Sequence, residues 1–185
     1  IVKIMTNKDI TIIITTFKSE DKIDLCLNSI DSEIKVIVVE NSSNHTFKNY
    51  LQKKYDNVEC VLTNDNFGYG KANNIGLKKV KTKYSLILNP DTTLKKETII
   101  NFNIFLKKKI NFAILGPSQS EFKLEDSDCY LSEVSAVKGF AMFLNMEKFS
   151  KIGFFDENIF LYLEEIDLCK RVKKLNEKIY TVSNI

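Results

Sequence analysis

Runs of β-branched residues alternate with amphipathic stretches along the first part of the chain. Residues 10–15 (ITIIIT) and 35–39 (KVIVV) are nearly continuous apolar runs, as is typical of parallel strands covered on both faces. Strands that alternate with helical stretches predict βαβ units. The pattern predicts strands at residues 10–15, 35–39, 58–62, 84–88 and 112–115, and helices at residues 21–30, 47–55, 71–80 and 97–108.

The second part of the chain is less regular. Residues 118–131 are polar and acidic and are expected to form a loop or lid, whereas residues 134–144 are apolar around Gly139. Because no internal repeat or low-complexity linker divides the sequence, we expect one α/β domain, with halves at about residues 1–116 and 117–185. The remaining predicted elements are helices at residues 146–152 and 164–175 and a last strand at residues 179–182.

The composition is that of an ordinary globular domain. With 185 residues, of which 44% are hydrophobic and 28% charged, the chain is long enough for one compact core. The net charge is only +3, and the local basic patch at lysines 78, 79, 81 and 83 is read as a solvated helix end. We therefore expect no nucleic-acid partner.

The cysteines and the apolar runs indicate the compartment. Four cysteines lie far apart without a CxxC pair, and His45 is the single histidine, so no zinc site is expected. No apolar run approaches the ~20 residues of a membrane span, and no signal peptide is visible. A cytoplasmic protein with reduced thiols is therefore expected, the cysteines being Cys26, Cys60, Cys129 and Cys169.

Polar residues follow four of the predicted strands directly. They are Thr15-Thr16, residues 40–43 (ENSS), residues 64–66 (NDN) and residues 89–91 (NPD). In open α/β sheets, ligands bind beyond the carboxyl ends of the parallel strands. Four such clusters in succession indicate a polar rim that matches a nucleotide in size.

Residues 89–91 (Asn-Pro-Asp) allow two interpretations. The strand before them would bring the carboxylate of Asp91 to the edge of the sheet, where a hard cation such as Mg²⁺ or Mn²⁺ binds carboxylates and substrate phosphates. The same tripeptide is also a good turn, and taken alone it favours the turn.

Residues 66–76 (NFGYGKANNIG) also allow two interpretations. Gly68 and Gly70 before a helix resemble a phosphate-binding loop, although neither a Walker motif nor GxGxxG fits the spacing. The alternative is a loop into a helix that packs closely through Gly76. Adjacent Asn73 and Asn74 argue against pure packing, because asparagine forms helices poorly.

The predicted helix at 164–175 begins with acidic residues. A helical wheel places Glu165 on the apolar face with Leu168 and Val172, and Asp167 on the opposite face. A carboxylate on an apolar face is costly unless it is paired or lines a cavity, and its pKa tends to be raised, which suits a general base. The alternative is that acids simply favour a helix N-terminus.

Together these features resemble glycosyltransferase family 2, inverting enzymes of the GT-A fold, and especially its bacterial rhamnosyltransferase-like members. Residues 12–17 look like the opening strand of the family, and residues 36–43 (VIVVENSS) like the strand and loop that hold the base and ribose. Residues 66–76 match the family's glycine- and asparagine-rich segment, and residues 88–92 (LNPDT) its DxD motif. Residues 153–171 are similar to the segment that carries the catalytic base.

The resemblance implies a role for each matching residue. Glu165 would be the catalytic base, where the family usually has Asp, and Asp91 the main protein ligand of Mg²⁺ or Mn²⁺. On the acceptor side it implies Gly139, Asp156, Glu164 and Asp167. For the donor nucleotide it implies Thr15, Thr16, Phe17, Glu40 (usually Asp in the family), Asn41, Asn66, Gly68, Asn73, Asn74 and Asn89.

The implied fold is a mainly parallel, mixed GT-A sheet flanked by helices, with the nucleotide-sugar site in the first half and the acceptor side in the second. The implied activity is metal-dependent transfer of a sugar from a UDP-, dTDP- or GDP-linked donor to a saccharide or lipid-linked acceptor in polysaccharide synthesis, in the cytoplasm and in peripheral contact with the inner face of the membrane. The family continues past the last strand and often adds a metal-binding histidine there, so the acceptor half is expected to be truncated.

Two other functions remain open from the residues. A non-catalytic nucleotide-binding domain of the same fold would bind nucleotide without sugar transfer. A nucleotidyltransferase is expected to have a glycine-rich loop after the first strand. Residues 15–18 (TTFK), at this position, do not form such a loop.

Overall fold

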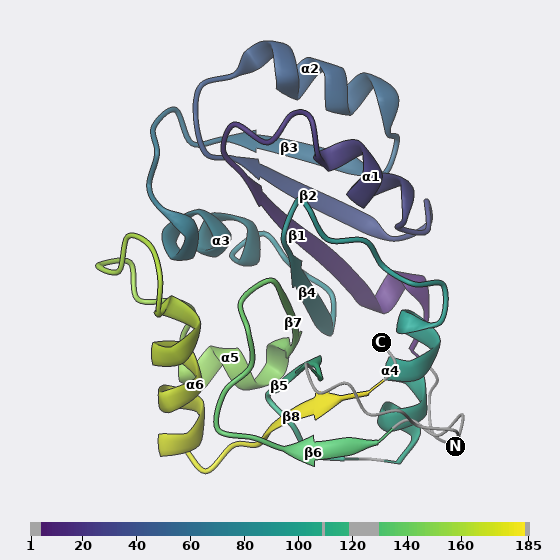
Figure 1. Ribbon diagram of the computed structural model, residues 1–185, viewed down its shortest axis with the longest axis vertical. Helices are drawn as coiled ribbons and strands as arrows, with labels where there is room; N and C mark the ends of the chain where they lie inside the picture. Colours follow the sequence, from purple (N-terminus) through teal and green to yellow (C-terminus); the bar gives the residue numbers. More distant parts are fainter. Residues whose placement is uncertain (1–4, 109, 119–129, 184–185) are drawn as a thin grey trace.

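Eight strands form one mixed sheet in the computed structural model, which describes residues 5–108, 110–118 and 130–183. Across this sheet the strand order is β3-β2-β1-β4-β7-β5-β8-β6 (Figure 1). The four strands β1 (Ile10–Thr16), β2 (Lys35–Glu40), β3 (Val58–Leu62) and β4 (Tyr84–Leu88) run parallel to one another. A second parallel pair is β5 (Ile114–Pro117) and β8 (Ile179–Val182), whereas β6 (Leu131–Glu133) and β7 (Ala141–Asn145) run antiparallel to their neighbours.

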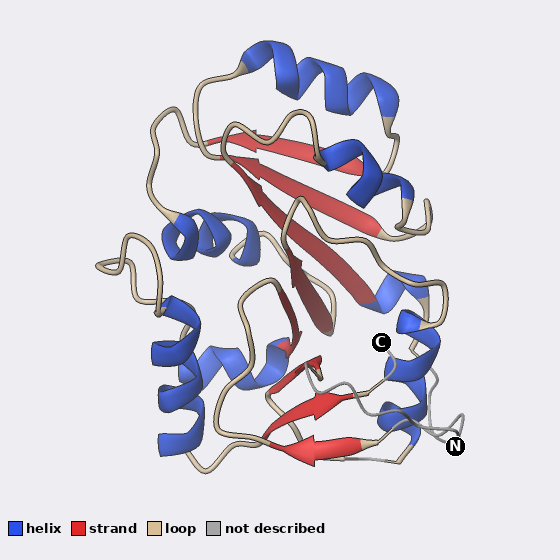
Figure 2. Ribbon diagram, viewed as in Figure 1, coloured by secondary structure: helices blue, strands red, loops and turns tan. Residues whose placement is uncertain are grey.

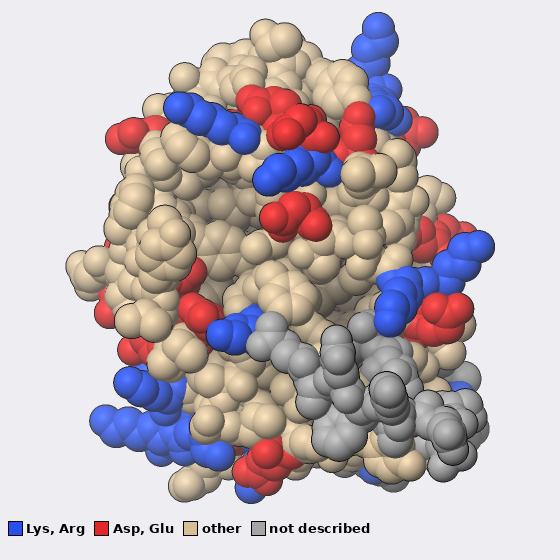
Figure 3. All heavy atoms as spheres, viewed as in Figure 1, with Lys and Arg blue, Asp and Glu red and all other residues tan. Residues whose placement is uncertain are grey.

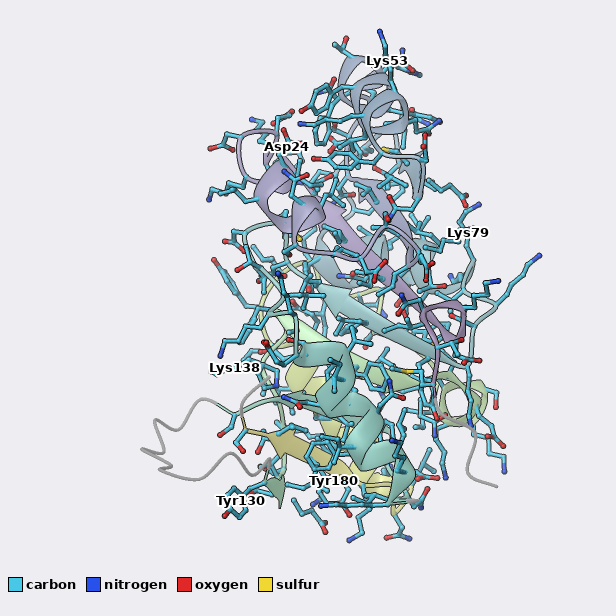
Figure 4. All side chains as sticks on the ribbon, turned by 90° about the vertical axis from the view of Figure 1, so that its right-hand side faces the viewer. Asp24, Lys53, Lys79, Tyr130, Lys138 and Tyr180 are labelled. Atoms are coloured by element: carbon cyan, nitrogen blue, oxygen red, sulfur yellow. The ribbon has the colours of Figure 1, made fainter. Side chains whose placement is uncertain are left out.

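Helices cover both faces of the sheet, which gives a three-layer arrangement (Figure 2). One face packs against α1 (Ile23–Asn28), α2 (His45–Lys54) and α4 (Thr98–Lys107). A short 3₁₀ helix, η1 (Asn7–Asp9), precedes β1 in the sequence. The other face packs against α3 (Tyr69–Leu77), α5 (Met146–Ile152) and α6 (Glu164–Lys174). In the view of Figure 4, α4 lies across the sheet.

The two layers of core follow from the alternation of side chains along the strands. Ile12 and Ile14 of β1 belong to the core with α1, α2 and α4, whereas Ile13 belongs to the core with α3, α5 and α6. Burial on both faces is the reason that β1 reads as an unbroken apolar run. Gly76 brings α3 close to β1, because a Cβ atom at this residue would lie 2.7 Å from Ile13 Cγ2.

All predicted strands and helices are present, although several begin or end at other residues than predicted. The fifth strand lies at Ile114–Pro117 rather than at residues 112–115, and α3 begins at Tyr69 rather than at residue 71. The strands β6 and β7 were not predicted. β7 lies antiparallel between β4 and β5, a pairing with distant segments that a local pattern does not contain. Residues 119–129 of the predicted loop or lid lie outside the described residues.

The cysteines in the described residues are free thiols, as the sequence predicted. Cys26, Cys60 and Cys169 are free and buried, while Cys129 lies outside the described residues. Burial raises the pKa of Cys26 to about 12 and that of Cys60 to about 11, so both thiols stay protonated. Of the helices in residues 5–108, 110–118 and 130–183, none combines the length and the apolar character that a membrane span needs.

Candidate active site

The carboxyl ends of β1, β2, β3 and β4 meet at one edge of the sheet, as the sequence predicted. Thr16 pairs in register with Glu40, and its hydroxyl donates to Glu40 Oε2 at 2.6 Å, while the Ser42 hydroxyl donates to Oε1. The Glu40 side chain is therefore buried and ties the ends of β1 and β2 together. Next to this pair, Thr15 Oγ1 is buried without a hydrogen-bond partner among the described residues, and Phe17 is exposed.

Asn41, directly after β2, fixes the glycine-rich loop before α3. Its Nδ2 donates to Asn66 Oδ1 at 2.9 Å and to the Gly68 carbonyl at 3.2 Å. Its Oδ1 accepts from the Phe67 amide at 3.0 Å and from the Thr63 hydroxyl at 3.3 Å. These hydrogen bonds use both the amide nitrogen and the amide oxygen of the Asn41 side chain. Asn41 therefore holds the loop beside the ends of the strands. Asn41, Asn66 and Gly68, three residues predicted to bind the donor nucleotide, thus belong to one hydrogen-bond network.

The adjacent asparagines of α3 have different surroundings. Asn74 accepts from the Phe155 amide at 3.0 Å and donates to the Phe155 carbonyl at 2.9 Å, so it joins α3 to the segment before α6. Asn73 donates to the Tyr69 carbonyl at 3.0 Å, but its Oδ1 is buried and unpaired among the described residues. Asn74 therefore has a structural role, whereas Asn73 is fully buried and leaves one acceptor unpaired among the described residues.

Tyr69 joins the predicted donor side to the predicted acceptor side. Its hydroxyl lies 3.0 Å from Asn89 Oδ1 and 2.8 Å from the Gly139 carbonyl oxygen. Burial raises the pKa of Tyr69, and the charges of Glu164, Glu165 and Asp91 raise it further. The hydroxyl therefore stays protonated, and all three carboxylates lie near enough to act on it. Tyr69 was not among the predicted site residues, and its signal in the sequence is a hydroxyl-bearing ring between two glycines.

Asp91 lies exposed just beyond the end of β4, and its charge adds to the effect of burial on the pKa of Cys26. Throughout the described residues, no group of three or more His, Cys, Asp or Glu side chains is placed to hold a metal ion. A single exposed carboxylate nevertheless fits Mg²⁺ or Mn²⁺, because such ions commonly take one or two protein carboxylates and complete their shell with substrate phosphates and water.

Glu164 and Glu165 begin α6 and line a depression of ≈ 290 Å³ together with Tyr69, Asn89 and Gly139. Residues from the loop after β4, from α3 and from the second half of the chain therefore meet in one place. The molecule is hollowed on this side, with acidic side chains near the hollow (Figure 3). The other lining residues are Phe140, Leu161, Tyr162 and Leu163.

The two carboxylates at the start of α6 differ in their burial. Glu164 is 6% exposed, its Oε2 is unpaired among the described residues, and burial raises its pKa. Glu165 is half-buried, and its side chain lies over Gly139, where an added Cβ would be 3.7 Å from Glu165 Cβ. Glu164 is the more buried of the two because α3 covers it at Gly70, whereas Gly139 has no side chain with which to cover Glu165, which lines the depression.

The raised pKa of Glu164 predicts a pH-dependent effect on stability. A folded-state pKa above the unfolded value means that protonation stabilises the fold, and that this stability is lost as the pH rises through the folded pKa. Glu164→Gln is therefore expected to raise the free energy of unfolding at pH 7, and to change it less at pH 4. Urea unfolding at the two pH values measures this, with Glu147→Gln on the exposed side of α5 as the control. An equal effect of Glu164→Gln at both pH values would contradict the prediction.

Asp156 and Asp167, both predicted on the acceptor side, are not among the residues that line this depression. Asp156 Oδ1 accepts from the amide and from the side chain of Asn158, which lowers its pKa. Asp167 pairs with Arg171 at 2.8 Å, and the guanidinium of Arg171 also binds the carbonyl oxygens of Ile152 and Phe154. In this structure both aspartates hold the segment that leads into α6.

A model of the glycosyl transferase family 2 matches residues 11–163 of the chain, from β1 to the residue before α6. The chain belongs to glycosyl transferase family 2. Among its relatives are the low-salt glycan biosynthesis hexosyltransferase Agl10 of Haloferax volcanii, 26% identical over 91% of this chain and 62% of the relative, and the rhamnosyltransferase WbbL of Escherichia coli K12, 26% identical over 92% of this chain and 79% of the relative. This family 2 chain therefore spans about three fifths of the length of the hexosyltransferase.

The fold is that of the GT-A glycosyltransferases. The mannosyltransferase PcManGT from Pyrobaculum calidifontis, solved in complex with GDP-Man and Mn²⁺, has a TM-score of 0.71 to this structure at 11% identity, over 95% of this chain and 56% of that one. The family match ends at residue 163, one residue before Glu164, so it does not include the two carboxylates at the start of α6.

Proposed function

We propose that this chain carries the donor site and the catalytic base of an inverting glycosyltransferase. It would move a hexosyl or rhamnosyl group from a nucleotide sugar to a saccharide or lipid-linked acceptor in the synthesis of cell-surface glycan. The observation that carries the proposal is that Tyr69, Asn89 and Glu165, from three distant segments, line one depression. Two of these segments reach it from the carboxyl ends of parallel strands, where open α/β sheets bind their ligands.

The relatives support both the reaction and the donor class. Two of the curated relatives are a hexosyltransferase and a rhamnosyltransferase, and the mannosyltransferase of similar fold binds GDP-Man. A UDP-, dTDP- or GDP-linked sugar fits the polar strand ends at Thr15 and Asn66, where Thr15 Oγ1 is buried without a partner among the described residues. Within the proposal, the chain works in the cytoplasm, with peripheral contact to the inner face of the membrane if its acceptor is lipid-linked.

In the proposed mechanism, Glu165 accepts the proton of an acceptor hydroxyl. The oxygen of that hydroxyl attacks the anomeric carbon of the donor, the bond from this carbon to the diphosphate oxygen breaks, and the configuration inverts. Glu165 suits this role because it lies half-buried over Gly139, with the depression open beside it. Glu164, buried against α3, would support the start of the helix rather than touch the acceptor.

Asp91 would hold a Mg²⁺ or Mn²⁺ ion together with the diphosphate of the donor. When bound, such an ion supplies Lewis-acid stabilisation of the departing diphosphate. The protonated hydroxyl of Tyr69 would keep the amide of Asn89 and the backbone of Gly139 at a fixed separation across the depression.

A binding screen tests the proposed function. UDP-, dTDP- and GDP-sugars are titrated with and without Mn²⁺, and donor hydrolysis and transfer are then measured. We expect one nucleotide class to bind in a metal-dependent manner and its sugar to be released. Nucleotide binding without hydrolysis or transfer would instead support a non-catalytic domain of the same fold, and the absence of any nucleotide binding would remove the proposal.

Asp91→Asn is expected to weaken metal-dependent nucleotide binding by at least about tenfold, since a direct metal ligand contributes no less than the outer-shell groups around a metal. Binding measured without metal should change little, because the amide keeps the size of the carboxylate. Isothermal titration with and without Mn²⁺ gives both values. Asp56→Asn, in the exposed loop before β3, is the matched control. Equal losses with and without metal would show that Asp91 does not act through a cation.

A further inference from the structure

The outer face of α4 is apolar. Ile100 is 60% exposed and Ile104 is 39% exposed, and because they lie four residues apart they are neighbours on one face of the helix. The inner face packs into the core through Phe102 and Phe105. A helix at the surface of a domain normally carries polar residues on the side away from the core. Packing within the domain therefore does not account for Ile100 and Ile104.

A groove of ≈ 520 Å³ continues this apolar face at the start of α4. It lies between α4 and the segment that joins α1 to β2, and the amide of Leu94 donates to Ser29 Oγ at 2.9 Å across it. The apolar side chains that line the groove are those of Ile30, Ile34, Leu94, Ile99 and Ile100. The exposed side chain of Ile100 is therefore part of a larger apolar surface that has depth.

Lysines stand at both ends of the apolar face. Lys95 and Lys96 precede α4 and line the groove, whereas Lys107 and Lys108 lie at the end of the helix. All four are exposed, and none forms an ion pair with an acid in the described part of the chain. Residues 95–108 contain these four lysines and one acid, Glu97, which gives the segment a net charge of +3.

The acids beside the groove belong to the turn before β2. Asp31 lines the groove, and its Oδ1 accepts from the Glu33 amide at 2.9 Å. Glu33 Oε2 accepts from Asn7 Nδ2 at 3.3 Å. These two carboxylates lower the positive charge at the start of α4 and leave its far end, at Lys107 and Lys108, unaffected beyond a screening length of about 10 Å.

We propose that the outer face of α4 docks on an anionic membrane surface. Ile100 and Ile104 would enter the boundary between headgroups and acyl chains, while the lysines at the two ends keep their ammonium groups at the lipid phosphates. The groove beside Lys95 and Lys96 would take part of an acyl chain. A second copy of the chain fits this face poorly: with lysines at both ends of α4, two such helices place lysine opposite lysine whether they run parallel or antiparallel.

Membrane docking through α4 leaves the candidate active site open. The depression is lined by residues of α3 and α6, which cover the opposite face of the sheet from α4. In the view of Figure 4, α4 lies in front of the sheet. Docking is thus independent of the proposed function, since it needs neither the donor nor Glu165.

Vesicle binding tests the docking surface. The unmodified protein should bind phosphatidylglycerol–phosphatidylcholine vesicles at least about tenfold more tightly than phosphatidylcholine vesicles, and about 1 M NaCl should remove the difference by screening. Replacing both Lys95→Gln and Lys96→Gln should weaken binding to the anionic vesicles about ten- to thirtyfold, since each lysine near such a surface contributes about fivefold. Replacing both Ile100→Gln and Ile104→Gln should weaken it at least about tenfold, through the loss of apolar area.

The matched control removes the same charge from the other side of the molecule. Lys170 and Lys174 are exposed on α6, and the double variant Lys170→Gln, Lys174→Gln should bind anionic vesicles within about twofold of the unmodified protein. An equal loss in this control would show that net charge rather than α4 binds the vesicles, and would overturn the proposal. Failure of the unmodified protein to bind anionic vesicles would overturn it as well.

Fluorescence identifies the occupant of the face. The chain contains no tryptophan, so Ile100→Trp creates a unique reporter. Its emission should shift to the blue with anionic vesicles and stay unchanged with soluble glycerol phosphate. Leu175→Trp at the end of α6, where Leu175 is 52% exposed, should respond to neither. A shift with glycerol phosphate, or one that grows with protein concentration without vesicles, would overturn the proposal in favour of a soluble phosphate ester or a second copy.

These measurements need no sugar donor, so their failure is distinct from that of the proposed function. If the protein binds vesicles through α4 but no nucleotide sugar, only the proposed function fails. If it transfers sugar and binds no vesicles, only the docking surface fails.

Discussion

Glu165→Gln should lower the rate of sugar transfer by about 10²- to 10⁴-fold, the usual contribution of a general base. Glutamine keeps the size of the side chain and its position over Gly139, but it has no basic oxygen with which to accept the proton of the acceptor. The affinity for the donor nucleotide should stay within about twofold, because the substitution leaves the strand ends and Asp91 unchanged. Transfer is measured by release of the nucleoside diphosphate, and affinity by titration calorimetry.

The neighbouring carboxylate supplies the matched control. Glu164→Gln removes a charge one residue away, from a side chain that is buried against α3. If Glu165 is the base, this control should lose far less activity than Glu165→Gln. The reverse order would make Glu164, whose pKa burial raises, the base and would sink the assignment. Full activity of both variants would leave neither carboxylate with a catalytic role.

The sequence was sufficient for the parallel half of the sheet because each signal there is local. β1 and β2 are apolar on both faces, so their runs are continuous and end abruptly at polar residues. Since parallel strands in register end at the same edge, the polar ends were predicted to meet, and the pairing of Thr16 with Glu40 confirms it. The order of the strands along the chain and their register were therefore enough to predict that the polar strand ends meet.

The second half depends on contacts that no local pattern contains. β7 enters the sheet between β4 and β5, antiparallel to both, and its pairing with Tyr84–Leu88 joins segments more than fifty residues apart. The burial of Glu164 rather than Glu165 has the same origin. A helical wheel ranks residues by the face of their own helix, but here the neighbours decide: α3 approaches at Gly70 and leaves space at Gly139.

The predicted site residues also divide into those that a local pattern identifies and those whose position depends on distant segments. Asn41, Asn66 and Gly68 were expected to contact a nucleotide. In the structure they bind one another by hydrogen bonds and so fix the conformation of the loop that such a ligand would contact. Tyr69 was missed because its position depends on Asn89 and Gly139, which lie twenty and seventy residues further along the chain.

Gly68→Ala should destabilise the fold by about 2–4 kcal/mol and remove most of the transfer activity. Gly68 has a φ of 78° and a ψ of 175°, a conformation that is almost restricted to glycine. A Cβ at this residue would lie 2.0 Å from the Phe160 carbonyl oxygen, which also accepts the Tyr69 amide. The loop before α6 would have to move away, and Tyr162, Glu164 and Glu165 would move with it.

Urea unfolding measures the loss of stability, and Gly139→Ala is its control. A Cβ at Gly139 would meet Glu165 at 3.7 Å, an ordinary contact, so this variant should unfold within about 1 kcal/mol of the unmodified protein. If Gly68→Ala proves as stable as Gly139→Ala and keeps its activity, the contact between the glycine-rich loop and Phe160 does not position the base. If it loses both, residues 66–70 act through the backbone: they hold in place the segment that carries Glu165, a role separate from any contact with the donor phosphates.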